Sequence, residues 1–401
     1  MKSDKLTAIF DTRFISVTLF LLFFLIDAVF RIREYDDKGV DFQVLIKIGL
    51  LFLCFLIGVN SIRYKIFYVK CLWLLLFLFS LFMSSLYSPD LFYGLYLSFS
   101  YMAVFLFIFY CFLVVGYNEI IIQAAKAFFA FTLISVFLYV FFPSLGRFSY
   151  WEFDVFFTSS RMSGLAGSAN NFARIMAVYI IILCFYRNVL RTVYSIKIIN
   201  LQLFLALSCL LLSGSRTTMA ALFACLLLFI FLKLNSKNKA RFLVLVLALA
   251  IALAYFLPIL LTYSSRHGGA DLASFTGRIF IWDVSLELIK ERLYLGYGIG
   301  SSVFLLPDYL SEVGFKASHA HNMYFQILLT VGFLGLLYFI LLIIFSVIRL
   351  FHMKEYGLIC LLALICAVGL LESGAFALTA NIFTVFLFIA LVRSRDSLVS
   401  F

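Results

Sequence analysis

Residues 92–116 read FYGLYLSFSYMAVFLFIFYCFLVVG, a run of 25 residues without one charged side chain. A transmembrane helix needs about 20 predominantly apolar residues, so this run is long enough to cross a bilayer. A helix at the surface of a soluble protein would carry a polar stripe toward water, and this run offers none. The sequence therefore predicts a membrane-spanning helix here.

The whole chain has the same character. Of its 401 residues, 65% are hydrophobic and 13% are charged, whereas soluble proteins are about half apolar and about one quarter charged. This composition excludes soluble enzymes, DNA-binding domains and disordered scaffolds, and we expect no nucleic-acid partner. All eight cysteines fall in apolar runs without C-x-x-C spacing, which indicates packing rather than disulfides or zinc.

We expect an all-α integral membrane protein with about twelve transmembrane helices, forming a single polytopic domain over residues 1–401. The first run is long and lacks a small-residue cleavage site, so it is interpreted as a retained span. The spans are expected near residues 14–30, 43–62, 67–87, 92–116, 119–142, 170–187, 198–214, 217–234, 242–264, 322–348, 356–371 and 375–392.

Charge placement predicts the orientation. With twelve spans both termini lie on one side, and that side collects most of the 31 Lys and Arg residues but few acids. This bias is typical of cytoplasmic loops, so both termini are expected in the cytoplasm.

Two outward segments, 143–169 and 265–321, are much longer than the other loops. Long loops in a compact fold are usually functional, so we expect the active site there. In the second, Ile279, Trp282 and Leu286 recur with Ile289 at helical spacing, which predicts an amphipathic helix on the outer surface, behind Gly277.

Arginines on the outer side run against the charge bias, and those singled out are Arg147, Arg161, Arg216, Arg266 and Arg278. Arg216 stands in LLLSGSRTTMAAL (210–222), at membrane-boundary depth, where an arginine is costly unless paired or hydrated. Its planar fork suits phosphate, and several arginines together suit a pyrophosphate. The alternative for any single arginine is a membrane anchor or a salt bridge to an outer acid such as Asp154 or Asp283.

His319 and His321 stand where the long outer loop re-enters the membrane, in KASHAHNMYFQILLTVGFLGLLYF (316–339). A neutral histidine there can accept a proton from a hydroxyl nucleophile. A metal site is the alternative, but no third soft ligand is near and H-E-x-x-H spacing is absent, so no metal or other cofactor is expected. Asn322 is expected to cap the next helix.

The segment GYGIGSS (296–302) looks superficially like a dinucleotide-binding loop. No βαβ unit surrounds it, so that interpretation fails. We expect its glycines to let backbone approach closely, at a turn or beside a ligand.

Together these motifs resemble those of the O-antigen ligase/polymerase superfamily of bacterial envelope glycosyltransferases. The resemblance covers roughly residues 161–340, and its most specific part is His321-Asn322 followed, nine residues later, by Gly332-x-x-Gly335. Its segments, in chain order, are RMSGLAGSANNFARIMA (161–177), SGSRTT (213–218), GRIFIWDVSLELIKERLYLGYGIG (277–300) and HAHNMYFQILLTVGFLGLL (319–337).

The resemblance implies a metal-independent glycosyltransferase of the GT-C type in the bacterial inner membrane, with a large periplasmic loop between helices 9 and 10. It implies catalytic roles for His321, Arg216 and Arg278. Arg161, Arg266, His319 and Asn322 are then candidate substrate-binding residues. The implied partners are an undecaprenyl-pyrophosphate-linked oligosaccharide, membrane lipid and a chain-length regulator protein.

Three functions remain open. The leading hypothesis is a polymerase that joins O-antigen or related repeat units, and the second is the ligase that transfers finished glycan to lipid A core. A transporter of polysaccharide or lipid is the rival from another class. It predicts charged residues inside several spans, where the sequence offers Asp27, Lys47 and Arg174.

Overall fold

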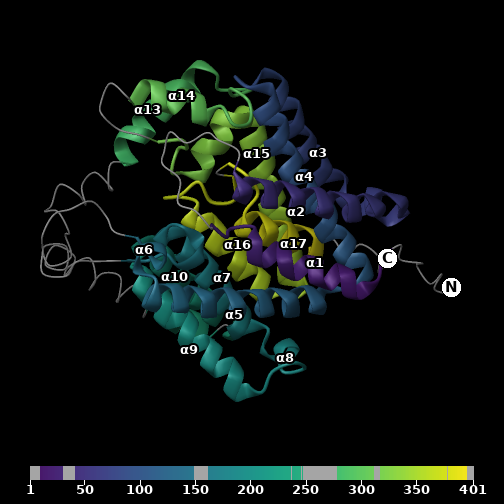
Figure 1. Cartoon of the computed structure of the whole chain (residues 1–401), viewed down its shortest axis with the longest axis vertical. Coiled ribbons are helices and arrows are strands. Elements are labelled where there is room, and N and C mark those ends of the chain that lie inside the picture. Colours follow the sequence, from purple (N-terminus) through teal and green to yellow (C-terminus); the bar gives the residue numbers. More distant parts are fainter. Residues whose placement is uncertain are drawn as a thin grey trace, which may run out of the picture.

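The computed structural model describes residues 10–29, 41–148, 161–235, 237–244, 246, 278–310, 317–376 and 378–394 (Figure 1). Within these residues the chain is almost entirely helical. Its regular strands there are β1 (Arg147–Phe148) and β2 (Arg161–Met162), which pair antiparallel. The expected all-α class is therefore confirmed.

In the described part of the chain, six helices are long and apolar enough to cross a membrane. The protein is thus a multi-pass membrane protein. The six are α2 (Phe42–Gly58) with the 3-10 turn η1 (Val59–Arg63), α4 (Leu91–Val114), α5 (Tyr117–Phe141), α9 (Ile196–Ser213), α10 (Arg216–Lys233) and α15 (Met323–His352).

Five shorter apolar helices accompany them. They are α1 (Thr12–Leu25), the part Leu72–Tyr87 of α3 (Lys65–Ser84) and η2 (Ser85–Tyr87), α7 (Ala169–Phe185), α16 (Tyr356–Val368) and α17 (Ile382–Arg393). Eleven of the twelve expected ranges thus coincide with an apolar helix. The twelfth, 242–264, lies almost wholly outside the described residues, so the count of twelve stays a prediction.

The expected start of the last span, residue 375, is wrong. Helix α17 begins only at Ile382, where the Asn381 side chain accepts from two backbone N–H groups, a standard helix N-cap. A second cap comes from the other end of the chain, because Asp27 Oδ2 accepts from Ile382 N at 3.0 Å. The segment between α16 and α17 is a folded connection that includes η5 (Gly374–Phe376).

Helix α17 lies in the middle of the bundle (Figure 1) and is buried along its length, from Ile382 to Val392. It packs against α16, α4 and α15. A helix that is apolar on every side must be enclosed by other helices or by lipid, and here helices enclose it. Other close pairs are α2 with α4, α7 with α9, α1 with α5, and α10 with α16.

Helix α15 is interrupted at Gly332, whose φ of 68° and ψ of −167° are not helical. The loop 293–298 runs beside the break: Tyr297 N donates to Leu329 O at 2.6 Å and Phe333 N donates to Leu293 O at 2.7 Å. A Cβ on Gly332 would lie 2.2 Å from Tyr294 O, so only glycine fits. Gly296 has φ +68°, and a Cβ there would lie 2.6 Å from Leu329 O, which confirms the expectation for the GYGIG segment.

The expected amphipathic helix exists as α13 (Arg278–Glu291), and α14 (Ser302–Leu310) packs against it at one end of the bundle (Figure 1). The predicted buried face is only partly right. Ile289 is buried, but Leu286 is 37% exposed, and Ile281 and Leu288 provide the other apolar contacts. These residues form a small second core with α14 and the start of α15.

Short elements complete the described chain: α6 (Pro143–Gly146), η3 (Gly164–Ala166) and α8 (Arg187–Leu190). Seven cysteines are described as free thiols, and most are buried among apolar helices. They therefore contribute to packing, as expected.

Candidate functional site

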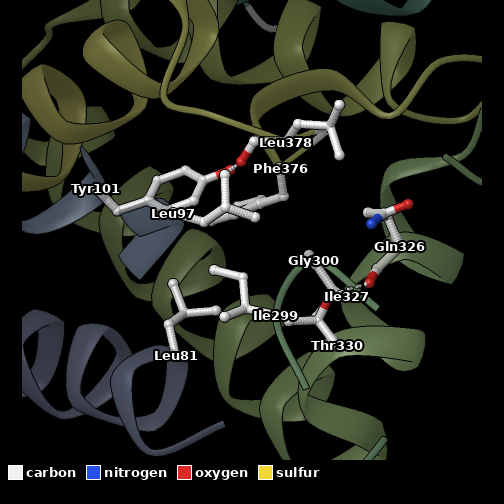
Figure 2. A pocket seen from close by; sticks show the side chains of 10 residues that line it. All are labelled: Leu81, Leu97, Tyr101, Ile299, Gly300, Gln326, Ile327, Thr330, Phe376 and Leu378. Carbon is white, nitrogen blue, oxygen red and sulfur yellow. Dashed lines mark hydrogen bonds between the residues drawn. The ribbon is translucent and has the colours of Figure 1, made fainter. Parts of the chain in front are cut away.

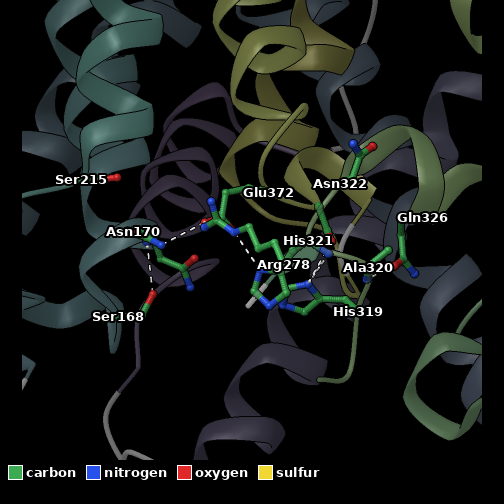
Figure 3. Close-up of polar contacts among 12 residues, drawn as sticks. Ser168, Asn170, Ser215, Arg278, His319, Ala320, His321, Asn322, Gln326 and Glu372 are labelled. Atoms are coloured by element: carbon green, nitrogen blue, oxygen red, sulfur yellow. Dashed lines mark hydrogen bonds and ion pairs between the residues drawn. The ribbon is translucent and has the colours of Figure 1, made fainter. Parts of the chain in front are cut away.

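A cluster of charged and polar side chains forms where four segments meet (Figure 3). The segments are the first turns of α7 and α13, the loop before α15, and the connection that follows α16. Three of the predicted residues, Arg278, His319 and His321, are brought together here. The group that joins them, Glu372, is one that the sequence analysis missed.

Glu372 is the centre of the cluster and is only 6% exposed. Its Oε1 atom accepts from Arg278 Nη2 at 2.6 Å and from Asn170 Nδ2 at 2.9 Å. Its Oε2 atom lies 3.4 Å from His321 Nδ1. Each carboxylate oxygen therefore faces a different part of the site.

The Glu372 carboxylate is ionised in the folded protein. Burial by itself raises the pKa of this carboxyl, but the contact with His321 and the positive charges of Arg278 and Arg174 act in the opposite direction. The net effect lowers the pKa from 4.5 to about 2. A buried charge is tolerated when it is paired and hydrogen-bonded in this way.

His321 is held in a strained position. Its φ is +47°, a left-handed value that is uncommon outside glycine and that concentrates at functional sites. The next residue fixes it: Asn322 Oδ1 accepts from Tyr324 N and Phe325 N, and Asn322 Nδ2 donates to Leu370 O at 2.9 Å. The expected cap at Asn322 is thus confirmed, and its amide groups are engaged in protein contacts.

His319 lies directly beside His321, with ring centroids 4.0 Å apart. Its Nδ1 atom is 2.9 Å from Ser373 Oγ and receives the backbone N–H of His321 at 3.4 Å. Burial, then the neighbouring His321, Arg174 and Arg278, lower the pKa of His319 to about 3, although Glu372 opposes them. His319 is therefore neutral at physiological pH.

This partly buried, neutral histidine should make stability depend on pH. An unfolded histidine titrates near about 6.5, and His319 in the folded protein titrates at about 3. Between these values the unfolded chain binds more protons, so stability is full above pH 6.5 and falls as the pH drops. One proton gives a slope of at most about 1.4 kcal/mol per pH unit.

We expect His319→Gln to remove this slope between pH 6.5 and 4.5, measured as the unfolding temperature of purified protein in detergent. His352→Gln is the matched control, because His352 is exposed and should leave the slope unchanged. An equal slope in the His319 variant would contradict the assignment. The window stops at 4.5 because Glu372 begins to contribute below that pH.

Arg161 joins the cluster indirectly. Its Nε donates to Ser213 O at 2.7 Å, and its Nη2 donates to Asn170 Oδ1 at 2.8 Å. Because Asn170 in turn donates to Glu372, a continuous polar chain runs from Arg161 to Arg278. Arg161, predicted to bind substrate, is therefore part of the site, and Asn170 connects it to Glu372.

Arg216 occupies a different position. It begins α10, two residues beyond Gly214, whose φ of 58° ends α9, so the expected helix junction is confirmed. The arginine side chain is exposed. Ser213, which receives Arg161, lies three residues before it, but the described partners of Glu372 are Asn170, Arg278 and His321. Arg216 is thus exposed and is not among the described partners of the carboxylate.

Arg216→Lys is expected to lower activity nearly as much as Arg216→Ala. An ammonium cannot reproduce the two-pronged contact of a guanidinium with phosphate, and a charged hydrogen bond contributes about 1.5–3 kcal/mol, or roughly ten- to hundredfold in rate. Glycan transfer in isolated membranes measures the effect. Arg191, which is also exposed, should tolerate both changes. Near-complete activity of the Arg216→Lys protein would mean that Arg216 contributes only a positive charge or a membrane anchor, and not a specific contact with phosphate.

Arg266 lies outside the described residues, as do residues 149–160 of the first long loop. The other outer arginine, Arg147, faces the end of α5: its Nε donates to Tyr139 O at 3.1 Å, and its guanidinium stacks 4.7 Å from the Tyr139 ring. Arg174, noted in the sequence as a charge within a span, lies close enough to affect His319 and Glu372.

The loop that carries both histidines is supported from behind by hydrogen bonds. Gln326 Nε2 donates to Ser302 Oγ at 2.9 Å, and Gln326 Oε1 accepts from Ala320 N at 3.1 Å. Ser302 Oγ donates in turn to Ser318 O at 3.0 Å. Figure 2 shows the small cavity next to Gln326; its lining includes no acid, base or histidine, so it is separate from the charged cluster.

Sequence reasoning missed Glu372, Asn170 and Ser373. Glu372 did leave a signal, because it is the one acid between Tyr356 and Ser394 and it stands between two apolar runs, in LLESG (370–374). Asn170 stands in the quoted segment 161–177, without a role of its own. Nothing in the sequence alone joins either residue to His321.

Residues 201–340 match the family model described as O-antigen ligase. This confirms the resemblance to the O-antigen ligase/polymerase superfamily. The matched region contains Arg216, Arg278, His319 and His321, whereas Glu372 and Arg161 lie outside it. No curated protein matches the chain.

Members of this family are glycosyltransferase-like enzymes, so the match supports a function of the O-antigen ligase/polymerase type. It also supports lipid and oligosaccharide as partners of this membrane protein.

Proposed function

We propose that the protein is a polymerase of O-antigen or a related surface polysaccharide. It joins repeat units linked to undecaprenyl pyrophosphate at the periplasmic face of the bacterial inner membrane, with both termini in the cytoplasm. The observation that carries the proposal is the Arg278–Glu372–His321 cluster, with Nη2–Oε1 at 2.6 Å and Nδ1–Oε2 at 3.4 Å. It combines a base with an orienting acid and a phosphate-binding cation.

In this mechanism His321 takes the proton of the acceptor sugar hydroxyl. The hydroxyl oxygen attacks the anomeric carbon of the donor and forms the new glycosidic bond. The bond from that carbon to the pyrophosphate oxygen breaks, and the lipid pyrophosphate leaves with the electron pair. General-base assistance contributes about 10²–10⁴-fold to such a step.

The arginines stabilise the charge that develops on the leaving pyrophosphate. Pre-placed cations do this without reorganisation at the moment of reaction. Arg278 uses Nη2 for Glu372, so its remaining N–H groups are free of this ion pair. These groups and the exposed Arg216 are the proposed phosphate contacts. Arg161 and Arg266 are proposed to bind substrate. We propose that no metal takes part, because the arginines supply the positive charge.

Glu372 is proposed to act through His321. Its negative charge, with Oε2 3.4 Å from Nδ1, orients the ring and favours the imidazolium that forms when the hydroxyl loses its proton. This is the role that an acid plays beside a catalytic histidine in hydrolytic triads.

Electrophoresis of lipopolysaccharide from a deletion strain tests the proposal. A single repeat unit on the lipid A core is the expected result, and plasmid-borne gene should restore the ladder. An unchanged ladder in the deletion strain would refute the function. A partner that regulates chain length, also proposed, would alter the length distribution of the ladder but not its presence.

The ligase is the second candidate, because the matched family model is described as O-antigen ligase. It predicts free core in the deletion strain, with finished polymer still on the lipid carrier. The transporter rival is weakened by the role of Asp27, which caps α17. Consumption of lipid-linked glycan by purified protein without an ion gradient would exclude it.

A further inference from the structure

The two adjacent histidines have different hydrogen-bond partners, and these partners fix different tautomers. At His319, Nδ1 receives the backbone N–H of His321 at 3.4 Å. A backbone N–H can only donate, so Nδ1 must present its lone pair. The Ser373 hydroxyl, 2.9 Å away, then also donates to Nδ1. The single proton of the neutral ring is therefore on Nε2.

At His321 the situation is reversed. Its Nδ1 faces Glu372 Oε2 at 3.4 Å, and an ionised carboxylate can only accept. When the ring acts as a base its proton is therefore placed on Nδ1, next to the carboxylate, and Nε2 presents the lone pair. Two rings with centroids 4.0 Å apart thus offer one acceptor and one donor.

We propose that His319 binds the acceptor sugar as a fixed hydrogen-bond donor, through Nε2–H, at the oxygen next to the hydroxyl that His321 deprotonates. This inference rests on the function proposed above. Hydroxyls on neighbouring carbons of a sugar are about one hydrogen-bond length apart, which suits two rings in van der Waals contact. The ligand feature recognised is therefore a vicinal pair of oxygens.

Three observations favour this role over a second base. The Nδ1 lone pair of His319 is already taken by Ser373 and by the His321 N–H. Among the described residues, none accepts from its Nε2–H, and His319 is only partly buried, so this donor is available for a ligand. The low pKa of His319, about 3, also makes it a weak base at neutral pH.

Nitrogen NMR of the purified full chain, labelled with ¹⁵N-histidine in lipid nanodiscs, tests the tautomer without any substrate. The chain has four histidines, and loss of one signal set in His319→Asn identifies His319. A neutral ring protonated at Nε2 at pH 7 is the expected result. A ring protonated at Nδ1, or a charged ring, would overturn the proposal.

Kinetics of two variants test the donor. A glutamine amide reaches the position of Nε2, whereas an asparagine oxygen replaces Nδ1 and keeps the bonds to Ser373 and His321. We expect His319→Gln to stay within a few-fold of the native KM for acceptor, and His319→Asn to raise it about tenfold. The opposite order would show that His319 only supports the loop.

The substrate in this assay is the lipid-linked repeat unit isolated from the deletion strain. Unfolding temperatures close to the native value would show that both variants are folded. If the native protein transfers no glycan from this donor, the proposed function fails. That outcome differs from a wrong tautomer in the nitrogen spectrum, which would refute the role of His319 alone.

Discussion

Replacing His321 by alanine is expected to abolish glycan polymer formation while leaving a normal amount of protein in the membrane. The reason is the loss of the general base, which contributes about 10²–10⁴-fold. The measurement is a lipopolysaccharide gel of the deletion strain that carries the variant, with an immunoblot of the membrane fraction. A full sugar ladder would remove the catalytic role and leave His321 a loop residue.

A second variant guards against a folding defect. His321 has φ +47°, and asparagine tolerates this left-handed backbone better than alanine does. His321→Asn should therefore fold as well as the native chain and be equally inactive. His352→Ala, at an exposed position, should keep the full ladder.

Glu372→Gln is expected to lower glycan transfer at least about a hundredfold, as loss of the orienting acid does in catalytic triads. The carboxylate is engaged on both sides: Oε1 accepts from Arg278 and Asn170, and Oε2 lies 3.4 Å from His321 Nδ1. A glutamine has one acceptor oxygen, so its NH₂ group must face a donor on one of these sides. Initial rates in purified membranes measure the loss.

Glu355→Gln is the matched control, because Glu355 is another acid paired with an arginine, at a half-buried position. Its Oε1 accepts from Arg393 Nη2 at 2.7 Å, outside the charged cluster. This variant should lose stability but keep its rate per folded molecule. Equal rate losses in both variants would mean that Glu372 serves only to hold the helices together.

Most of the helices could be predicted from the sequence, because membrane helices satisfy their backbone hydrogen bonds internally and are therefore recognisable as long apolar runs. It failed at the last span. Residues 375–380 are as apolar as the helix that follows, and the Asn381 and Asp27 caps that start α17 at Ile382 are tertiary features. Hydropathy alone cannot distinguish a buried apolar connection from the first turns of a helix.

The candidate site could be predicted only in part. Arg278, His319 and His321 could be predicted from the sequence because each stands at an unusual place relative to the apolar runs. The carboxylate that joins them is far away along the chain: 94 residues separate Glu372 from Arg278. Such a pairing depends on how the helices pack, and no local pattern encodes it. The tautomers of the two rings likewise depend on Ser373 and Glu372.

The break in α15 makes the number of residues between His321 and Gly332 critical, because it sets how the two ends of this helical segment are oriented relative to each other. Both ends of the intervening helix are fixed to other segments: Met323 N donates to Gly369 O, and Gly332 is pressed against the Tyr294 carbonyl. One residue inserted between them would rotate one end against the other by about 100°. A single inserted residue should therefore lower glycan transfer as much as loss of the histidine does. An insertion after Gly335 would leave the spacing from His321 to Gly332 unchanged.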